Sequence, residues 1–176
     1  MTLHEMACNL AVESLLPILG VNMTAPNRYG NAAEMLIKAF LNFTDCRVSA
    51  QNEPDIIFSG VEYEVKTGSG TLSAEGNEPI PNCDYVVYIP HVDETVSLRR
   101  QEGFVIAREK FLRIMNDLHL IRWSKNNGRG GQSIGLQTIW NRKQGKPHSL
   151  KTFTALLDAL YEQSEMTLDE WLILNA

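Results

Sequence analysis

The most constraining feature of this sequence is the uninterrupted apolar run Tyr85-Val86-Val87-Tyr88-Ile89, which lies within residues 84–89. A short run of this kind suits a β-strand, and a strand without apolar/polar alternation is typical of the interior of a sheet. The run is far shorter than the roughly 18–20 apolar residues that a membrane-spanning helix needs. We therefore expect residues 84–89 to form an inner strand, and we expect no membrane association.

Helical and strand patterns alternate along the rest of the chain. Amphipathic or apolar segments predict helices over residues 2–19, 28–42, 109–120, 149–161 and 167–174. Short apolar or alternating segments predict further strands over residues 47–49, 55–58, 61–66, 103–107 and 134–140. Runs rich in glycine, proline and polar residues predict a long loop over 67–82 and a flexible basic loop over 125–131.

These elements predict a single α+β domain. The chain has 176 residues, about the length of one domain, and 44% of them are hydrophobic, which is enough to bury a core. We expect an α/β sandwich over residues 1–176, in which helices flank a central mixed β-sheet. The core is expected over about 28–140, followed by a helical C-terminal extension over about 149–176.

The cysteines and the N-terminus indicate a compartment. Cys8, Cys46 and Cys83 are too few and too scattered for a disulfide framework or a zinc site. No basic region precedes an apolar stretch at the N-terminus, so we expect no secretory signal. A reducing cytoplasm is the simplest location.

The net charge of −5 hides a strong partition along the chain. Residues 1–98 carry four basic and 13 acidic side chains, a net of −9. Residues 99–151 carry 12 basic and three acidic side chains, a net of +9, and the last 25 residues carry five acids and no base. An acidic block followed by a basic block is typical of a metal site beside a phosphate-binding surface. Chance clustering on solvated faces explains the charge pattern equally well.

Residues 54–66 hold the most informative chemistry. A turn at Ser59-Gly60 would fold 55–58 and 61–66 into a hairpin that brings Asp55 near Glu64. Two converging carboxylates repel each other unless a cation lies between them, and hard oxygen ligands suit Mg²⁺. Lys66 follows on the same strand face as Glu64, where it could hold a water molecule and offset charge growing on a phosphate.

This arrangement resembles the PD-(D/E)XK nuclease superfamily, the group of restriction endonucleases and related DNA-processing enzymes. The matching residues are Pro54-Asp55 and Glu64-Val65-Lys66, and Glu34 stands on the helix that precedes the motif, where the family places an acidic residue. The resemblance covers roughly residues 28–115. It implies a restriction endonuclease-like core. The core sheet would be completed by the strand over 84–89, the helix over 109–120 and the strand over 134–140.

The resemblance also implies a role for each motif residue. Asp55 and Glu64 would bind Mg²⁺, with Mn²⁺ as a substitute, and the backbone carbonyl of Val65 would be a further ligand. Lys66 would position the attacking water. Glu34 would be an auxiliary acid that reaches the metal directly or through water.

Two features leave alternatives open. Glu34 stands four residues before Lys38, so a plain helical ion pair is an alternative to a role in the site. Many members of the family follow the motif strand promptly with a helix, whereas residues 67–82 contain too much glycine and proline for one. We expect that segment to be a substrate-contacting loop.

A DNA-binding surface is expected in the basic block. Lys125 and Arg129 flank a glycine-rich segment whose backbone could approach phosphates closely, although a flexible connector is the alternative. Amide and cationic side chains that could read base edges in the major groove or contact phosphates follow, at Gln132, Gln137, Asn141, Arg142, Lys143 and Lys146.

The function expected from these features is a Mg²⁺-dependent endodeoxyribonuclease, most simply a type II restriction endonuclease that acts on double-stranded DNA as a homodimer. One alternative is a repair, recombination or mobile-element nuclease with the same fold. Another is a non-catalytic DNA-binding or protein-interaction subunit.

Overall fold

The structure, a computed structural model, describes most of the chain from Gly20 onward. Its described residues are 20–22, 24, 28–50, 53–68, 71–73, 80–90, 103–126, 129–135, 140–141, 144 and 146–175. Four helices and ten strands occur among them, which confirms the mixed α+β class. The helix expected over residues 2–19 lies outside the described residues.

The central sheet has five strands in the order β1-β2-β4-β5-β10. These strands span Ile56–Phe58, Val61–Thr67, Tyr85–Ile89, Phe104–Ala107 and Met166–Thr167. The β2–β4 pair is parallel and the other three pairs are antiparallel, so the sheet is mixed as expected. The apolar strand β4 lies in the middle, and residues 86–89 are fully buried, which confirms the prediction for this segment.

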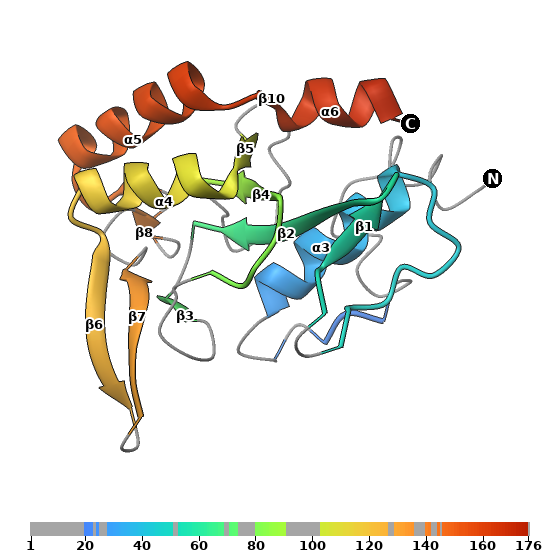
Figure 1. The fold of residues 1–176 in the computed structure, drawn as a ribbon, viewed down its shortest axis with the longest axis horizontal. Helices are drawn as coiled ribbons and strands as arrows, with labels where there is room; N and C mark the ends of the chain where they lie inside the picture. The colour runs from blue at the N-terminus through green and yellow to red at the C-terminus, as the bar shows by residue number, and fades with distance from the viewer. Residues whose placement is uncertain are drawn as a thin grey trace.

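Helices cover both faces of this sheet (Figure 1). Helices α3 (Arg28–Phe40) and α6 (Leu168–Asn175) pack on one face, and α4 (Arg108–Asp117) and α5 (Leu150–Gln163) pack on the other. Because side chains alternate along a strand, each face receives its own apolar set. The α3 face buries Tyr63, Val65, Val87, Ile89 and Val105. The α4 face buries Val86, Tyr88, Phe104 and Ile106.

The β1–β2 hairpin forms as the sequence predicts. Ser59 and Gly60 both have positive φ, of 52° and 78°, as a two-residue type I′ turn requires. The turn fixes the register that pairs Phe58 with Val61 and Ile56 with Tyr63. The short strand β1 therefore begins one residue after Asp55, beside the middle of β2.

Residues 47–49 do not form the predicted strand. Their N–H groups donate to side chains instead of to a neighbouring strand: Arg47 N bonds to Asp45 Oδ1 at 3.0 Å, and Ser49 N bonds to Glu34 Oε1 at 2.7 Å. Polar partners from α3 and from the preceding loop thus replace the ladder that a strand needs.

The basic block folds differently from the prediction. The expected loop over 125–131 is wrong, because β6 (Ile121–Asn126) and β7 (Arg129–Gly135) form an antiparallel hairpin across Asn127-Gly128, a dipeptide that favours such turns. Strand β3 (Thr71–Ser73), inside the expected loop 67–82, pairs with β7. These strands make a separate sheet in the order β3-β7-β6, and the hairpin extends away from the central sheet (Figure 1).

The strand predicted over 134–140 does not join the central sheet in the described part of the chain. Residues 134 and 135 end β7, residues 136–139 lie outside the described residues, and β8 (Trp140–Asn141) pairs with β9 (Lys146–Pro147). The fifth strand of the central sheet comes instead from β10 in the C-terminal segment. No helix in the described part of the chain is long and apolar enough to cross a membrane.

Candidate active site

Asp55 lies at the point where the β1–β2 ladder stops. Ile56 pairs with Tyr63, so extending the register by one residue places Asp55 opposite Glu64. Side chains of directly opposed residues share one face of a hairpin. The structure thus brings together the two carboxylates that the sequence selected, at the end of β1.

The main chain of Val65 faces Asp55. Asp55 Oδ2 accepts a hydrogen bond from Val65 N at 2.8 Å. The N–H and carbonyl of one strand residue face the same neighbour, so the Val65 carbonyl lies on this side of β2 as well. If the ladder continued, its next residue would be Pro54, which has no N–H to donate to that carbonyl. Asp55 and Glu64 are therefore opposed across the hairpin, and the Val65 carbonyl faces the same side of β2 as Asp55.

Glu64 and Lys66 lie on the opposite face of β2 from Val65. Glu64 is buried, with 4% of its surface exposed, and one of its oxygens is ion-paired with the Lys66 ammonium. The Lys66 side chain remains 20% exposed. In the parallel register these two residues stand beside Val86 and Tyr88, so the pair lies at the margin of the apolar α4 face. The ammonium can reach solvent from there.

The electrostatics of the site centre on Asp55. The pKa of this carboxyl is raised from an ordinary 3.8 to about 7. Burial is the largest cause, and the charge of Glu64 and a smaller contribution from the charge of Glu34 act in the same direction. The charge of Lys66 and the hydrogen bond from Val65 lower the pKa of Asp55 without offsetting these effects. A nearby cation would favour the ionised form. Without a cation, the carboxyl of Asp55 is therefore partly protonated near neutral pH.

Glu34 lies on α3 and does not complete a three-carboxylate cluster. Its Oε1 accepts hydrogen bonds from Lys38 Nζ at 2.6 Å and from Ser49 N at 2.7 Å. The helical ion pair that the sequence allowed is thus present. In the described part of the chain, no group of three or more His, Cys, Asp or Glu side chains is arranged to hold a metal. Glu34 acts on the site through its charge, which contributes to the raised pKa of Asp55.

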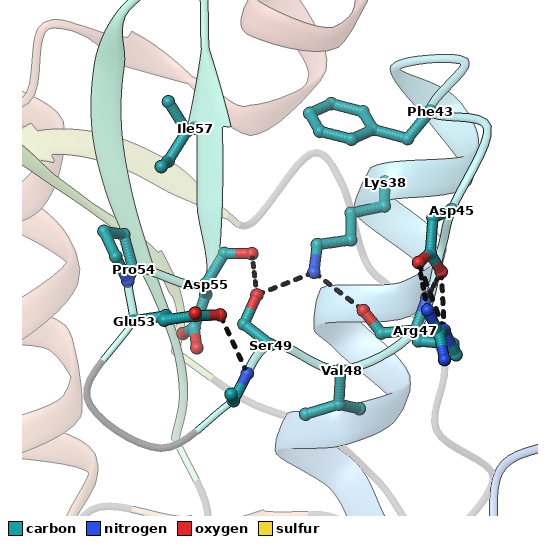
Figure 2. A pocket seen from close by; sticks show the side chains of 11 residues that line it. Lys38, Phe43, Asp45, Arg47, Val48, Ser49, Glu53, Pro54, Asp55 and Ile57 are labelled. Atoms are coloured by element: carbon teal, nitrogen blue, oxygen red, sulfur yellow. Dashed lines mark hydrogen bonds and ion pairs between the residues drawn. The ribbon is translucent and has the colours of Figure 1, made fainter.

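Sequence reasoning missed Ser49 and the full role of Lys38. Lys38 is only 6% exposed, and its Nζ donates to Glu34 Oε1, to Arg47 O at 2.8 Å and to Ser49 Oγ at 2.9 Å. Ser49 Oγ in turn donates to Asp55 O at 2.9 Å (Figure 2). The only sequence signal for this network was the four-residue spacing of Glu34 and Lys38.

The end of α3 explains how Ser49 reaches the site. Asn42 adopts φ of 62°, with Asn42 N bonded to Ala39 O at 3.1 Å and Phe43 N bonded to Lys38 O at 3.0 Å. This is the Schellman arrangement that ends a helix and reverses the chain. Residues 43–50 therefore return along α3 and bring Ser49 against the side chains of the helix.

A pocket of about 660 Å³ opens beside Asp55 (Figure 2). It is lined by Lys38, Phe43, Asp45, Arg47, Val48, Ser49, Ala50, Glu53, Pro54, Asp55 and Ile57. Val48 and Ile57 are 39% and 56% exposed, so one part of the wall is apolar and open to solvent. The pocket gives a ligand access to Asp55 from the outer edge of β1.

The structure places the expected DNA-binding residues only in part. Gln137, Arg142 and Lys143 lie outside the described residues. Asn141 is half-buried in β8, and Lys146 is exposed in β9.

The other three expected DNA-binding residues lie in the β6–β7 hairpin, where their side chains are outside the described part of the structure. The register pairs Lys125 with Gly130, Asn126 with Arg129 and Trp123 with Gln132.

Comparison of the chain with protein-family models, curated proteins and solved structures gave no match.

Proposed function

We propose that this protein is a Mg²⁺-dependent endodeoxyribonuclease with a restriction endonuclease-like core. The observation that carries the proposal is that Asp55 stands opposite Glu64 beside the main chain of Val65, with Lys66 on the same strand as Glu64. The mixed sheet with helices on both faces supports it, because these residues lie on two adjacent strands of that sheet.

The donor set fits Mg²⁺. Carboxylate and carbonyl oxygens are the hard ligands that this ion prefers, and Mg²⁺ is commonly bound by one or two carboxylates while water and phosphate fill its other positions. Two side-chain carboxylates and one main-chain oxygen therefore suffice, and Glu34 need not bind directly. The raised pKa of Asp55 supports the same assignment, because a bound cation would stabilise its ionised form.

Each residue then has a defined task. When bound, the ion would supply Lewis acidity and lower the pKa of a bound water. Asp55 and Glu64 would hold the cation, and the carboxylate of Asp55 is itself held by Val65 N. Lys66 has solvent access for holding the attacking water and for offsetting negative charge that grows on the phosphate.

The charge pattern supports duplex DNA as the substrate. No acidic residue occurs between Asp117 and Asp158, a stretch with seven lysines and arginines that includes the β6–β7 hairpin. A two-stranded β-ribbon fits the major groove of B-DNA. We propose a type II restriction enzyme that works as a homodimer, since two copies suit cleavage of both strands at a symmetric site.

Cys46 and Cys83 are free and buried, which suits the reducing cytoplasm.

The test is cleavage of mixed-sequence duplex DNA in Mg²⁺ by the wild type and by Asp55→Ala and Lys66→Ala. We expect the wild type to cut and both variants to lose at least about 100-fold in rate, the lower range for a group that acts on the reacting atoms. Asp117→Ala is the matched exposed carboxylate, and Lys110→Ala is a matched lysine, paired with Glu165 away from the site. Cleavage that survives both site variants would overturn the assignment.

A second candidate is a non-catalytic DNA-binding subunit. Two observations favour it: Lys66 is paired with Glu64, and the described residues hold no three-side-chain metal cluster. Calorimetry with Mn²⁺ separates the two candidates, because a protein that binds DNA but no Mn²⁺ at these carboxylates is not this nuclease. Discrete bands from genomic DNA would favour a restriction enzyme, whereas a preference for flaps or junctions would favour a repair or recombination nuclease.

A further inference from the structure

We propose that Ser49, held by the buried ammonium of Lys38, is a positioning residue for Asp55, and the inference rests on the proposed metal-dependent function. Ser49 is six residues before Asp55 and belongs to no helix or strand. Its hydrogen bonds connect α3 directly to the residue that ends the β1–β2 ladder.

Both the main-chain N–H and the hydroxyl of Ser49 take part in the hydrogen-bond network. Its N–H donates to Glu34 Oε1 at 2.7 Å, and its Oγ accepts from Lys38 Nζ at 2.9 Å. The Oγ hydrogen then goes to Asp55 O, 2.9 Å away. A serine hydroxyl has one donor hydrogen, so accepting from Lys38 leaves that hydrogen directed at Asp55.

The buried Lys38 fixes this arrangement. An ammonium group has three donor hydrogens and no acceptor, and those of Lys38 go to Glu34, Arg47 O and Ser49. Withdrawing a charge from water is costly unless it is paired and hydrogen-bonded, so a displacement of Ser49 would leave a buried donor unsatisfied. Lys38 therefore holds both the hydroxyl of Ser49 and the main chain at Arg47 in one place.

Asp55 is consequently held at two points. Ser49 fixes its main-chain carbonyl from the α3 side, and Val65 N fixes its carboxylate from β2. No strand partner holds the main chain of Asp55, because β1 begins at Ile56. Without the Ser49 hydroxyl, the main chain at Asp55 gains freedom and the carboxylate loses its alignment on Val65 N and on any cation shared with Glu64.

The experiment compares Ser49→Ala and Ser49→Thr with the wild type, and Ser164→Ala, beyond the end of α5, is the matched control. Amide hydrogen exchange is followed at Val65, whose N–H depends on the Asp55 carboxylate, and at Glu64 and Lys66, whose N–H groups face β4. Mn²⁺ affinity is measured by calorimetry. We expect Ser49→Ala to speed exchange at Val65 alone by about fivefold, the size of one lost hydrogen bond, and to weaken Mn²⁺ binding similarly.

Ser49→Thr retains the hydroxyl and should restore both values, whereas Ser164→Ala should change neither. Unchanged exchange at Val65 in Ser49→Ala would overturn the positioning role. Equal acceleration at Glu64, Val65 and Lys66 would overturn it too, because it would indicate general loosening of β2. If the wild type binds no Mn²⁺, the proposed function fails, and exchange at Val65 alone still decides the positioning role.

Discussion

At the scale of single residues, the candidate site stores electrostatic strain at Asp55. The positive charge that lowers the pKa of Asp55, Lys66, is ion-paired with Glu64, so Asp55 keeps only partial compensation from it. Functional sites commonly reduce stability in this way, because charges arranged for a ligand are poorly satisfied without it. Ionisation of Asp55 should therefore lower the free energy of unfolding of the metal-free protein.

The first prediction is that, without metal, the Asp55→Asn variant is more stable than the wild type at pH 8 but not at pH 4.5. The pKa of Asp55 is raised to about 7 in the folded protein and is about 3.9 in an unfolded chain. The folded state thus binds more protons between these values, and stability falls as pH rises from about 4 to about 7. Removing the charge should raise the free energy of unfolding at pH 8 by on the order of 2 kcal/mol, with no such gain at pH 4.5.

Urea unfolding in EDTA at the two pH values measures this effect. Asparagine still offers an oxygen to Val65 N, so the hydrogen bond that Asp55 accepts can be kept. Asp117→Asn, at an exposed carboxylate, should show no dependence of this kind. A loss of stability of equal size at both pH values would contradict the prediction.

Residue-level prediction from the sequence succeeded where spacing alone sets the contact. The helical step from Glu34 to Lys38 and the turn between Asp55 and Glu64 are both local, so their pairings could be foreseen. The contacts of Ser49 could not be foreseen, because they depend on how the chain leaves α3 through Asn42 and returns along it. An irregular segment has no period from which to infer its path.

At the scale of elements, the Ser59-Gly60 turn sets the alignment of the site. A shift of one residue in hairpin register moves every side chain to the opposite face, which would separate Asp55 from Glu64. Both turn residues have left-handed φ, a conformation that glycine and asparagine adopt at low cost and that serine and alanine adopt less readily. The turn is therefore under mild strain at Ser59.

The second prediction follows from this strain. Ser59→Asn should raise the free energy of unfolding by about 0.5 kcal/mol, whereas Gly60→Ala should lower it by about 1 kcal/mol. Open space surrounds Gly60, so its substitution tests backbone conformation without a steric clash. Urea unfolding of both variants supplies the measurement, and Gly30→Ala, inside α3 with equally open surroundings, is the control that should stabilise. Equal effects at Ser59 and Gly60 would argue against a type I′ turn.

Among the elements, sequence patterns predicted those with a clear apolar period. Strands β2, β4 and β5 and helices α3 and α4 show why, since within each core cluster their buried residues recur at characteristic steps of two, three or four. The β6–β7 hairpin escaped prediction because Gly130-Gly131 and polar neighbours erase the alternation in β7. Pairing there follows from the Asn127-Gly128 turn signal and from partners distant in sequence such as β3.

At the scale of the whole molecule, the C-terminal segment completes the central sheet. Strand β10 pairs with β5, and α6 adds Leu168, Trp171 and Leu172 to the core on the α3 face. The junction is tight: a Cβ on Gly103 would lie 2.8 Å from Leu168 Cβ, and Gly103 O accepts a hydrogen bond from Leu168 N at 2.7 Å. The segment expected as a helical extension thus contributes to the core itself.

The third prediction concerns this junction. Gly103→Ala should lower the free energy of unfolding by about 1–3 kcal/mol through overpacking, and Leu168→Ala should lower it by about 2–5 kcal/mol through a cavity. The double variant removes Leu168 Cγ and Cδ2, which would lie 3.4 and 2.8 Å from the new methyl group, and leaves only the Cβ contact, so its loss should be smaller than the sum of the two. Denaturant unfolding of all three variants tests the coupling, and strict additivity would show that Leu168 is not what Gly103 accommodates.

The fourth prediction joins the charge partition to the fold. The basic segment 99–151 contributes the β6–β7 hairpin, while Asp55 and Glu64 belong to the acidic segment and lie at the central sheet. Duplex DNA binding should therefore weaken steeply with salt, because phosphate contacts release counterions at about 0.9 per contact. Lys125→Ala and Arg129→Ala should each reduce the slope of log K against log salt by about 1.

Fluorescence anisotropy with a labelled duplex in EDTA measures these slopes without cleavage. Arg47→Ala is the informative control: its side chain is 85% exposed and ion-paired with Asp45, but it belongs to the acidic segment. If Arg47→Ala lowers the slope as much as the hairpin variants do, DNA approaches along the pocket beside Asp55 and the hairpin is not its main contact. If only Lys125→Ala and Arg129→Ala lower it, the β6–β7 hairpin supplies the main phosphate contacts, as expected for a two-stranded ribbon that enters the major groove.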